Sequence, residues 1–421
     1  MQNAALSRRI GTEIQLGNKI GGSLFSKVRI GYRDGKEYAV KYTKMSIPKK
    51  REDIHKQLEN EIEALTALQH PNIVKLHGHG YTGWYTKEYK DRTAETEIAY
   101  SVLDKPRQGT LIDIIYYAGA MNERIVRFYF KQLLSAVKYI HNSNYAHRNL
   151  KLTSLFIGND YNLLLSGFKY TKKISSGSKD SDGFMSRKSA MCPQSLQSQK
   201  CDLIMDDLFA LGYILFIMLY KVKPFEAATV TDLKYKLIYE HKMENFWAIF
   251  SKIETSNEVK DLLSSMLAFE SYLRPSIGEI EASAWMNGET PILQEIQKEI
   301  ESKMYTTETR LKEEAMKRKM AKQEQHAGKS GNKVPVMTSL AGTAPHVTRT
   351  IQGPTSSFSS KPKKQVKPLC SEIVAPTHVY SMEHPDHIED ALVSYVVSSA
   401  SEFKSDDKKY KVMVLNQDDK N

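Results

Sequence analysis

The chain has 421 residues, a length that suggests about two or three domains, and its hydrophobic (41%) and charged (26%) fractions are ordinary for a globular protein. Its longest apolar run, residues 208–220, is shorter than the roughly 18 residues that a membrane-spanning helix needs, and its N-terminus lacks the apolar core of a signal peptide. Its three cysteines have no metal-ligand spacing, so we expect a reducing, cytoplasmic environment.

The net charge of +11 is concentrated toward the C-terminal end. Residues 302–370 hold 14 basic and 4 acidic side chains, a net charge of +10, whereas residues 371–421 hold 5 basic and 10 acidic ones, a net charge of −5. The basic segment could meet an acidic membrane surface or an acidic protein, or it could be a solvated linker. We predict no specific nucleic-acid site.

Strand patterns come first along the chain and helix patterns follow. Residues 14–45 alternate apolar and polar side chains in short runs separated by glycine, which predicts antiparallel strands. A helix is expected at 53–69, two strands near 73–82 and 97–104, and long helices at 122–142 and 206–220. This order predicts an α+β fold with two lobes, a β-rich N-lobe and a helical C-lobe.

The pattern changes after about residue 287. Residues 288–326 predict a charged helical extension, whose apolar stripe either forms a short coiled coil or, as we favour, packs on its own domain. Residues 327–370 are expected to be a basic disordered linker, and residues 371–421 either a small α/β module or an acidic tail. The stripe consists of Leu293, Ile296, Ile300, Met304 and Leu311.

Short motifs in the first half follow a familiar order. Residues 20–28 resemble the glycine-rich loop that covers ATP phosphates in kinases, with Gly21 in the first glycine position and Ser23 and Ser26 in the other two. Lys41 ends an Ala-Val-Lys run on the next predicted strand, and Glu61 lies in the helix after it. Each feature alone is weak, so their order relative to the later motifs carries the argument.

The strongest motif is His147-Arg148-Asn149-Leu150-Lys151. It resembles the kinase catalytic loop His-Arg-Asp-Leu-x-x-x-Asn, in which Asp is the base and the final Asn holds magnesium. Here Asn149 replaces the base and Ser154 the second position, while Gly167-Phe168-Lys169 stands where Asp-Phe-Gly belongs. Residues 191–194 fit the Ala-Pro-Glu position with Gln194 in place of Glu, and Asp207 and Arg274 fit two later family positions.

Together these motifs identify residues 14–287 as resembling the eukaryotic Ser/Thr protein kinase domain. Residues 128–133 and 262–267 are typical of its calcium/calmodulin-dependent and AMP-activated branch, which the domain resembles most. Residues 377–415 faintly resemble a kinase-associated domain. The resemblance implies that Lys41 and Glu61 clamp the nucleotide phosphates and that Lys151 lies near the γ-phosphate. It also implies a nucleotide pocket formed by Gly21, Val28, Ala39, Leu103, Asp104 and Phe156.

The same resemblance implies a loss of chemistry. Asn149 cannot accept a proton as the family's aspartate does, and Ser154 and Gly167 occupy both magnesium-ligand positions, so we expect no ordinary magnesium site and at most weak ATP binding. The apolar spine of the family, here Leu65, Leu76, Phe168 and His147 anchored by Asp207, is present. Arg148 could bind a phosphate on the serine-rich segment 175–189, although that segment could also be a plain exposed loop.

Two functions from different classes follow. The favoured one is a pseudokinase that acts as a regulatory scaffold or allosteric partner of another protein, which we expect to be another kinase or a signalling protein. The alternative is a divergent active Ser/Thr kinase that uses a displaced carboxylate, for which Asp160, Asp180 and Asp182 are the nearest by sequence. Nucleotide binding without catalysis is a third reading, favoured by Lys41.

Overall fold

The computed structural model describes residues 7–23, 25–46, 53–106, 110–174, 190–197 and 202–330. The predicted linker was placed at 327–370, but residues 327–330 are helical. The rest of that segment, the predicted module at 371–421 and the serine-rich segment 175–189 lie outside the described residues. One compact unit includes the described chain up to Arg310, and a second begins at Leu311.

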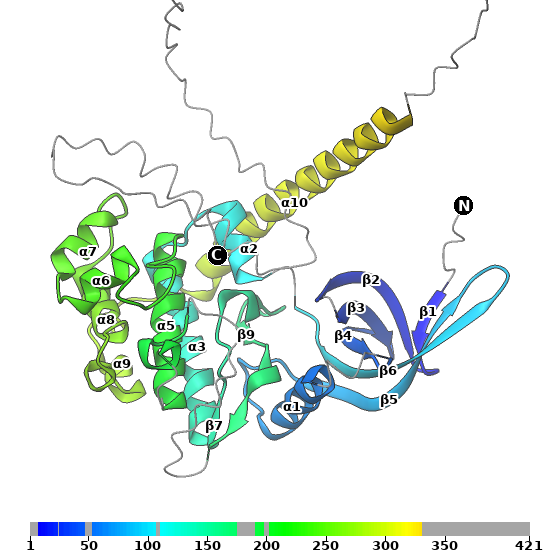
Figure 1. Cartoon of the computed structure of the whole chain (residues 1–421), viewed down its shortest axis with the longest axis horizontal. Coiled ribbons are helices and arrows are strands. Elements are labelled where there is room, and N and C mark those ends of the chain that lie inside the picture. The colour runs from blue at the N-terminus through cyan, green and yellow to red at the C-terminus, as the bar shows by residue number, and fades with distance from the viewer. Residues whose placement is uncertain are drawn as a thin grey trace, which may run out of the picture. The chain divides into compact units, whose positions relative to one another are not determined.

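The N-lobe is a closed barrel of six strands with the order β1-β2-β3-β4-β6-β5 (Figure 1). The strands are β1 (Ser7–Ile10), β2 (Ile14–Gly22), β3 (Ser26–Arg33), β4 (Lys36–Lys44), β5 (Leu76–Glu88) and β6 (Thr93–Asp104). Helix α1 (Asp53–Ala67) packs outside the barrel through Leu58 and Ile62, which contact Ala99 of β6. The barrel interior is filled by Ile10, Ile14, Leu16, Val40, Tyr42, Tyr85, Ile98 and Val102.

Two features of the barrel were not predicted. Strand β1 was missed, because Ser-Arg-Arg-Ile offers only one apolar residue to an alternation pattern. The β5–β6 hairpin is also longer than expected, running to Glu88 and restarting at Thr93. The two features depend on each other, since β1 pairs antiparallel with the hairpin extension, Ile10 opposite Tyr85, and thereby closes the barrel.

One glycine is required by close packing inside the barrel. A Cβ atom on Gly31 of β3 would lie 2.3 Å from Cγ2 of Val40 and 3.1 Å from Cγ2 of Ile14. Strands β2, β3 and β4 therefore approach closely only because residue 31 has no side chain.

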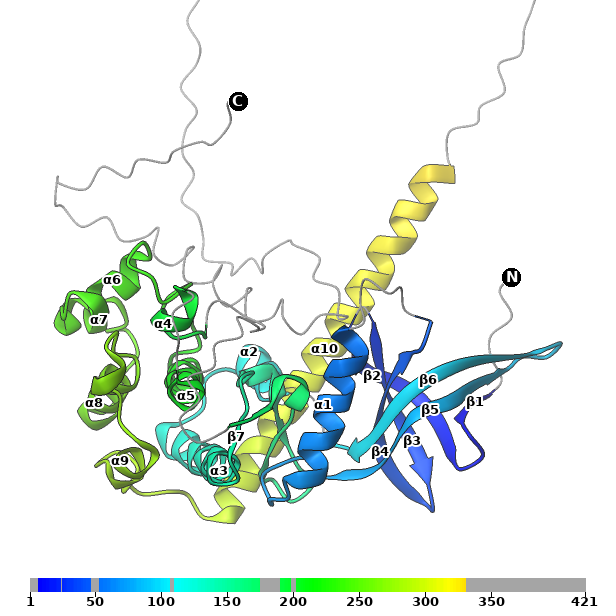
Figure 2. The same cartoon turned by 60° about the horizontal axis from the view of Figure 1, so that its bottom comes forward.

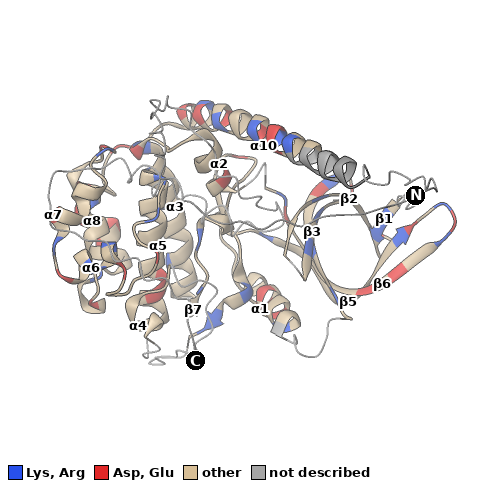
Figure 3. Cartoon of the chain, turned by 45° about the horizontal axis from the view of Figure 1, so that its top comes forward, with Lys and Arg blue, Asp and Glu red and all other residues tan. Residues whose placement is uncertain are grey.

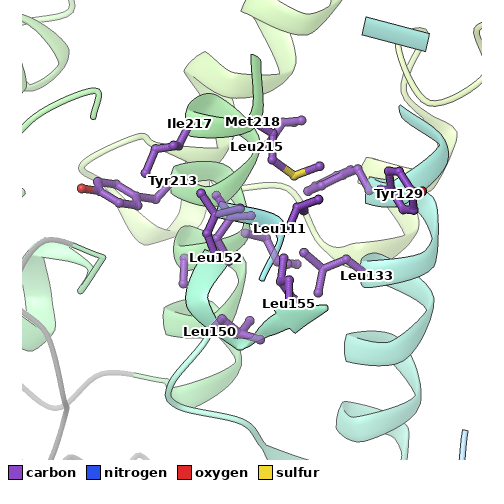
Figure 4. Close-up of a cluster of buried hydrophobic side chains, with 14 of the residues drawn as sticks. Leu111, Tyr129, Leu133, Leu150, Leu152, Leu155, Tyr213, Leu215, Ile217 and Met218 are labelled. Carbon is purple, nitrogen blue, oxygen red and sulfur yellow. The ribbon is translucent and has the colours of Figure 1, made fainter. Parts of the chain in front are cut away.

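The C-lobe is helical and its core lies between α3 (Glu123–Asn142) and α5 (Leu203–Tyr220). Figure 4 shows side chains from these two helices meeting Leu111 of α2 (Leu111–Ala118) and Leu150, Leu152 and Leu155 of the segment that follows α3. The remaining elements are α4 (Pro193–Leu196), α6 (Leu233–Tyr239), α7 (Met243–Ile249), α8 (Asn257–Met266), α9 (Ile277–Ala282) and the short strands β7 (Tyr145–Ala146), β8 (Leu155–Ile157), β9 (Leu163–Leu165) and β10 (Lys172–Lys173).

Helix α5 begins at Leu203, three residues before the predicted segment 206–220. Its 18 residues have a mean hydropathy of 1.9, enough by length and composition to cross a membrane. In the fold, however, 89% of this helix is buried inside the protein. Its apolar surface is thus accounted for by the C-lobe core, as in the central helix of a globular domain.

Helix α10 (Leu293–Ser330) begins by packing on the C-lobe (Figure 2). Ile296, Ile300 and Met304 are buried in the main core, which agrees with the favoured interpretation of the stripe, whereas Leu293 is 51% exposed. Lys303 Nζ donates hydrogen bonds to the carbonyls of Ala118 (3.2 Å) and Ala120 (3.1 Å) at the end of α2. The lysine therefore caps the negative end of that helix.

Candidate functional site

Asp207 of α5 holds the loop that follows β7. Its Oδ2 and Oδ1 atoms accept hydrogen bonds from the backbone nitrogens of His147 and Arg148, each at 2.8 Å, and Oδ2 lies 3.0 Å from Nε2 of His141. Burial raises the pKa of this carboxyl, but the hydrogen bond and charge of His141 outweigh it and leave the pKa below its ordinary value. An ionised Asp207 thus fixes the backbone next to Asn149.

The spine residues come together as the resemblance implies. His147 and Phe168 are fully buried, and their rings meet edge to face with centroids 4.7 Å apart. Leu65 of α1 is buried in the same core, and Leu76 of β5 packs against it. Burial lowers the pKa of His147 to about 4, so its ring is neutral at physiological pH and serves packing.

The three altered catalytic positions form one cluster. Asn149 Nδ2 donates a hydrogen bond to the carbonyl of Gly167 at 3.2 Å, and the backbone nitrogen of Ser166 donates to the carbonyl of Ser154 at 2.9 Å. Gly167 is left-handed, with φ 92° and ψ 35°. A Cβ atom on Gly167 would lie only 2.6 Å from Oγ of Ser154, so the serine occupies the space beside the glycine.

This cluster has no ionised oxygen ligand. Asn149, Ser154 and Gly167 are uncharged, and Asn149 and Ser154 are both buried. Within the ranges that the structure describes, no group of three or more His, Cys, Asp or Glu side chains could hold a metal ion. Hard cations such as Mg²⁺ are held by carboxylates and other oxygens, so this cluster does not fit the magnesium that kinase domains use.

Lys41 and Glu61 form an ion pair between the barrel and α1. Lys41 Nζ donates a hydrogen bond to Oε2 of Glu61. Glu61 is only 2% exposed, and the Lys41 side chain is 21% exposed. The pair therefore has the geometry that would position the Lys41 ammonium group to bind nucleotide phosphates. It also neutralises the buried Glu61 carboxylate.

The residues predicted to form the nucleotide pocket come from both lobes. Gly21 pairs with Val28, Val28 with Lys41, and Ala39 with Leu103, so these residues lie together on adjacent strands. Ala39 and Leu103 are buried, and Val28 packs against the same core. Phe156 lies half-buried on β8 of the C-lobe, where its backbone forms a bridge to Thr110.

Asp104 and Lys151 are the remaining predicted site residues, and each has its own contacts. Asp104 Oδ2 accepts a hydrogen bond from the backbone nitrogen of Lys75 at 2.8 Å, and its Oδ1 lies 2.6 Å from Nε2 of His77. Its carboxylate is thus turned toward β5. Lys151 is half-buried and lines a cavity beside the catalytic loop.

That cavity brings in a carboxyl group that the sequence argument missed. It lies between residues 148–152, residues 190–191 and α5, and Asp206 lines it together with Asn149. Asp206 accepts hydrogen bonds from the backbone nitrogen of Cys192 (3.1 Å) and from Oγ of Ser195 (2.6 Å). Burial, followed by the neighbouring Cys192, raises the pKa of Asp206 to about 8. A second aspartate beside Asp207 in a very apolar helix was the signal that could have revealed it.

Gln194 and Arg274, which fit two family positions, are hydrogen-bonded to each other. Arg274 Nη2 donates to Oε1 of Gln194 at 2.8 Å and to the carbonyl of Phe269 at 2.9 Å. The amide therefore replaces a carboxylate as the partner of a buried arginine. The segment that Arg148 was expected to contact is not described, so that prediction stays a prediction.

Comparison with known proteins now identifies the family. The model for the protein kinase domain matches residues 14–286, about two thirds of the chain. The chain belongs to the protein kinase family. A strand-rich N-lobe followed by a helical C-lobe agrees with this membership.

Its relatives include serine/threonine kinases from distant organisms. The chain is 31% identical over 274 residues to the probable serine/threonine-protein kinase MARK-B of Dictyostelium discoideum. The aligned region covers 65% of this chain and 36% of MARK-B. It is 30% identical to the human testis-specific serine/threonine-protein kinase 1 (68% of this chain, 74% of that protein) and to the CBL-interacting protein kinase 32 of Oryza sativa subsp. japonica (68% and 61%). The chain thus spans about a third of the first relative's length.

Kinase domains use ATP and magnesium, and the residues of this chain fit the two unequally. Lys41, paired with Glu61, would hold nucleotide phosphates, and Gly21, Val28, Ala39 and Leu103 would form an apolar wall above a base. The magnesium positions do not fit, because Ser154 fills the space next to Gly167 and neither residue offers a carboxylate.

Proposed function

We propose that this protein is a pseudokinase, a kinase-fold regulatory protein with negligible phosphotransfer. The observation that carries the proposal is the cluster at Asn149, in which the amide donates to Gly167 and Ser154 occupies the space of a residue 167 side chain. Loss of a general base typically lowers a rate by about 10²–10⁴, and loss of the metal ligands acts on the same step.

The alternative, a divergent active kinase, needs a carboxylate elsewhere. Asp160 lies in the turn of the β8–β9 hairpin, where it accepts hydrogen bonds from the nitrogen (3.1 Å) and amide (2.8 Å) of Asn162. In that hairpin Ile157 pairs with Leu163 near the turn and Leu155 pairs with Leu165 at the opposite end, next to Gly167. Asp160 is thus at the wrong end of the hairpin to replace a ligand at residue 167.

The two carboxyls that line the cavity beside Asn149 are also engaged. Asp207 holds the backbone of His147 and Arg148, and Asp206, with a pKa raised to about 8 by burial, is protonated at neutral pH. A protonated carboxyl cannot accept the proton of a substrate hydroxyl. Asp180 and Asp182 lie outside the described residues.

A turnover assay separates the two functions. Purified protein is incubated with ATP labelled in the γ-phosphate, magnesium or manganese, and a generic protein substrate. The control is Lys41→Met/Glu61→Gln, which removes the clamp without leaving a buried charge unpaired. We expect equal, background incorporation for both proteins; incorporation that the double substitution abolishes would establish the active kinase.

Nucleotide binding without transfer is proposed as a weak residual property. Lys41 supports it, and the magnesium positions predict that binding does not depend on the metal. We expect a thermal shift with millimolar ATP that is the same with and without magnesium, and a smaller shift for the control variant. No shift at all would remove the nucleotide from the proposal.

The regulatory role implies a protein partner, which we propose to be another kinase or signalling protein. The fold would then act through its surface, and the assay is the activity of a candidate partner kinase with and without this chain. An effect that depends on turnover by this chain would contradict a scaffold role.

Contact of segment 302–370 with an acidic membrane and a cytoplasmic location remain predictions from the charge and cysteine pattern.

A further inference from the structure

One end of the N-lobe barrel collects basic side chains. Residues paired across adjacent strands point to the same face of a sheet. Val40, Tyr42 and Ile98 lie inside the barrel, and the residues paired with them are Arg29, Lys27 and Lys44, respectively. These three basic side chains therefore project from the inner face, with Lys27 and Lys44 exposed at the end of the barrel.

The strands that close the barrel add three more. Ile10 pairs with Tyr85 in the interior, and the next pair on that face is Arg8 with Lys87. Lys19 of β2 pairs with Arg29. Figure 3 shows basic segments on β1 and β3 of this barrel. We name the six residues the basic ring: Arg8, Lys19, Lys27, Arg29, Lys44 and Lys87.

The ring members are close enough to repel one another. Burial lowers the pKa of Lys27, and the positive charges of Lys44, Lys87, Arg29 and Lys19 lower it further. Opposite Tyr85 and Lys87, strand β6 contributes only Thr96 and Ala94. No Asp or Glu therefore occupies the inward-facing positions of the described strands at this end.

Two guanidinium groups of the ring have buried donors without acceptors. The Nε atoms of Arg8 and Arg29 are buried and have no hydrogen-bond partner among the described residues, although Nη1 of Arg29 donates to the carbonyl of Gly17 at 2.6 Å. Buried donors are nearly always satisfied in folded proteins. Because a guanidinium group binds phosphate oxygens particularly well, these donors are suited to an anion.

Two tyrosines form the floor beneath the ring. The rings of Tyr42 and Tyr85 stack with centroids 4.9 Å apart, and Lys87 Nζ lies 5.8 Å from the Tyr85 ring centre. Burial raises the pKa of Tyr85 to about 12, so its hydroxyl keeps its proton at physiological pH. Side chains thus fill the barrel below the ring, as expected for a barrel of few strands, and a ligand would sit at the rim.

We propose that the basic ring binds a small anion with two or more phosphomonoester groups, the chemistry shared by inositol polyphosphates and phosphoinositide headgroups. Six converging positive charges exceed what one carboxylate or one phosphate neutralises. They meet at one rim, whereas a nucleic-acid backbone needs a stripe of charge that follows it. The ring belongs to the barrel end and its residues are separate from the Asn149 cluster, so the proposal does not depend on the proposed function.

The test uses the full chain and myo-inositol hexakisphosphate, with inorganic sulfate as the comparison anion, in isothermal titration calorimetry at physiological salt. The ring variant is Lys27→Ala/Lys44→Ala. The matched control is Lys36→Ala/Lys56→Ala, which removes two exposed lysines of the same lobe outside the ring. We expect binding of the hexakisphosphate that weakens at least about tenfold in the ring variant and stays within about twofold in the control.

Folding is checked on the same proteins without ligand. Because Lys27 and Lys44 repel each other, the ring variant should unfold at the same or a higher temperature than the unaltered chain. Equal loss of binding in both variants, or no binding of the hexakisphosphate at millimolar concentration, would overturn the proposal. So would RNA that competes for the ring more tightly than the hexakisphosphate does.

Vesicles distinguish the two sources of the anion. The chain is sedimented with phosphatidylcholine vesicles that contain either phosphatidylinositol bisphosphate or phosphatidylserine at equal total charge. Binding to the first alone, lost in the ring variant and displaced by soluble hexakisphosphate, identifies a lipid headgroup. Binding of the soluble anion without vesicle binding identifies a soluble ligand, and equal binding to both vesicles in all variants would assign membrane contact to another segment.

Discussion

Gly167→Ala tests whether the magnesium position has closed. A left-handed backbone costs a residue with a Cβ atom about 1–2 kcal/mol, and Gly167 has φ 92°. The new methyl group would also lie 2.6 Å from Oγ of Ser154, a clash of the size that costs about 1–3 kcal/mol in a packed core. The reduced freedom of the unfolded chain returns about 0.4–1 kcal/mol. The expected net loss of stability is therefore about 1–5 kcal/mol, with a central value near 3 kcal/mol.

A matched glycine separates strain from clash. Gly35, in the turn between β3 and β4, has φ 70°, and nothing lies within 4 Å of the position of its Cβ. Gly35→Ala should therefore show the backbone term alone, about 1 kcal/mol. Ser154→Ala combined with Gly167→Ala should recover most of the clash term, because the oxygen that causes it is gone.

The assay is urea unfolding followed by tryptophan fluorescence, with equal slopes required for the comparison. The reasoning is refuted if Gly167→Ala costs no more than Gly35→Ala, or if Ser154→Ala restores nothing. Either result would mean that the serine does not fill the space beside residue 167. Because Ser154 fills the space beside residue 167, we also expect that Gly167→Asp alone does not create a magnesium-dependent thermal shift.

Three further variants probe the surrounding structure. The pKa of Asp206 is about 8 in the fold against an ordinary value of 3.8, so the unfolded chain loses this proton at a lower pH than the folded one. The free energy of unfolding should therefore fall by up to about 1.4 kcal/mol per pH unit as the pH rises between these two values. Asp206→Asn should remove this pH dependence in urea titrations, and an unchanged pH dependence would contradict the prediction. Lys41→Met should lower the free energy of unfolding by about 3 kcal/mol, because it leaves the buried Glu61 carboxylate unpaired. Lys41→Met/Glu61→Gln should lower it by less, and a larger decrease in the double variant would argue against the ion pair. Lys303→Ala should lower stability by about 1–2 kcal/mol through the lost cap on α2, measured against the exposed Lys298→Ala, and equal effects would mean that the cap contributes nothing.

Local patterns predicted the parts of the fold that depend on local interactions. The helix at 122–142 was expected from its apolar spacing and observed at Glu123–Asn142. Motif order predicted Asn149 and Gly167 as altered positions, and the fold brings them within hydrogen-bond distance. The sequence could not show that Ser154 fills the space at Gly167, because that contact depends on how two loops are held by Asp207 and by the β8–β9 pairing.

Long-range pairing accounts for most of what was missed. Strand β1 is recognisable only through its partner β5, about 75 residues away, and the basic ring exists only because the barrel closes. In the sequence its members are scattered lysines and arginines, of the kind usually found on exposed strand faces. Their common direction follows from register, and register across non-adjacent segments is not written in any short pattern.

The retained kinase features have a physical reason to persist without catalysis. Glu61 is buried and needs a positive partner, so Lys41 stabilises the contact between α1 and the barrel whether or not a nucleotide binds. His147, Phe168 and Asp207 likewise serve burial and backbone support. Asn149 and Gly167 stand where the family pattern has aspartates, which removes the repulsion between carboxylates that a magnesium ion would otherwise offset. The presence of Lys41 is therefore weak support for phosphotransfer, and the neutral cluster at Asn149 is the stronger indicator of function.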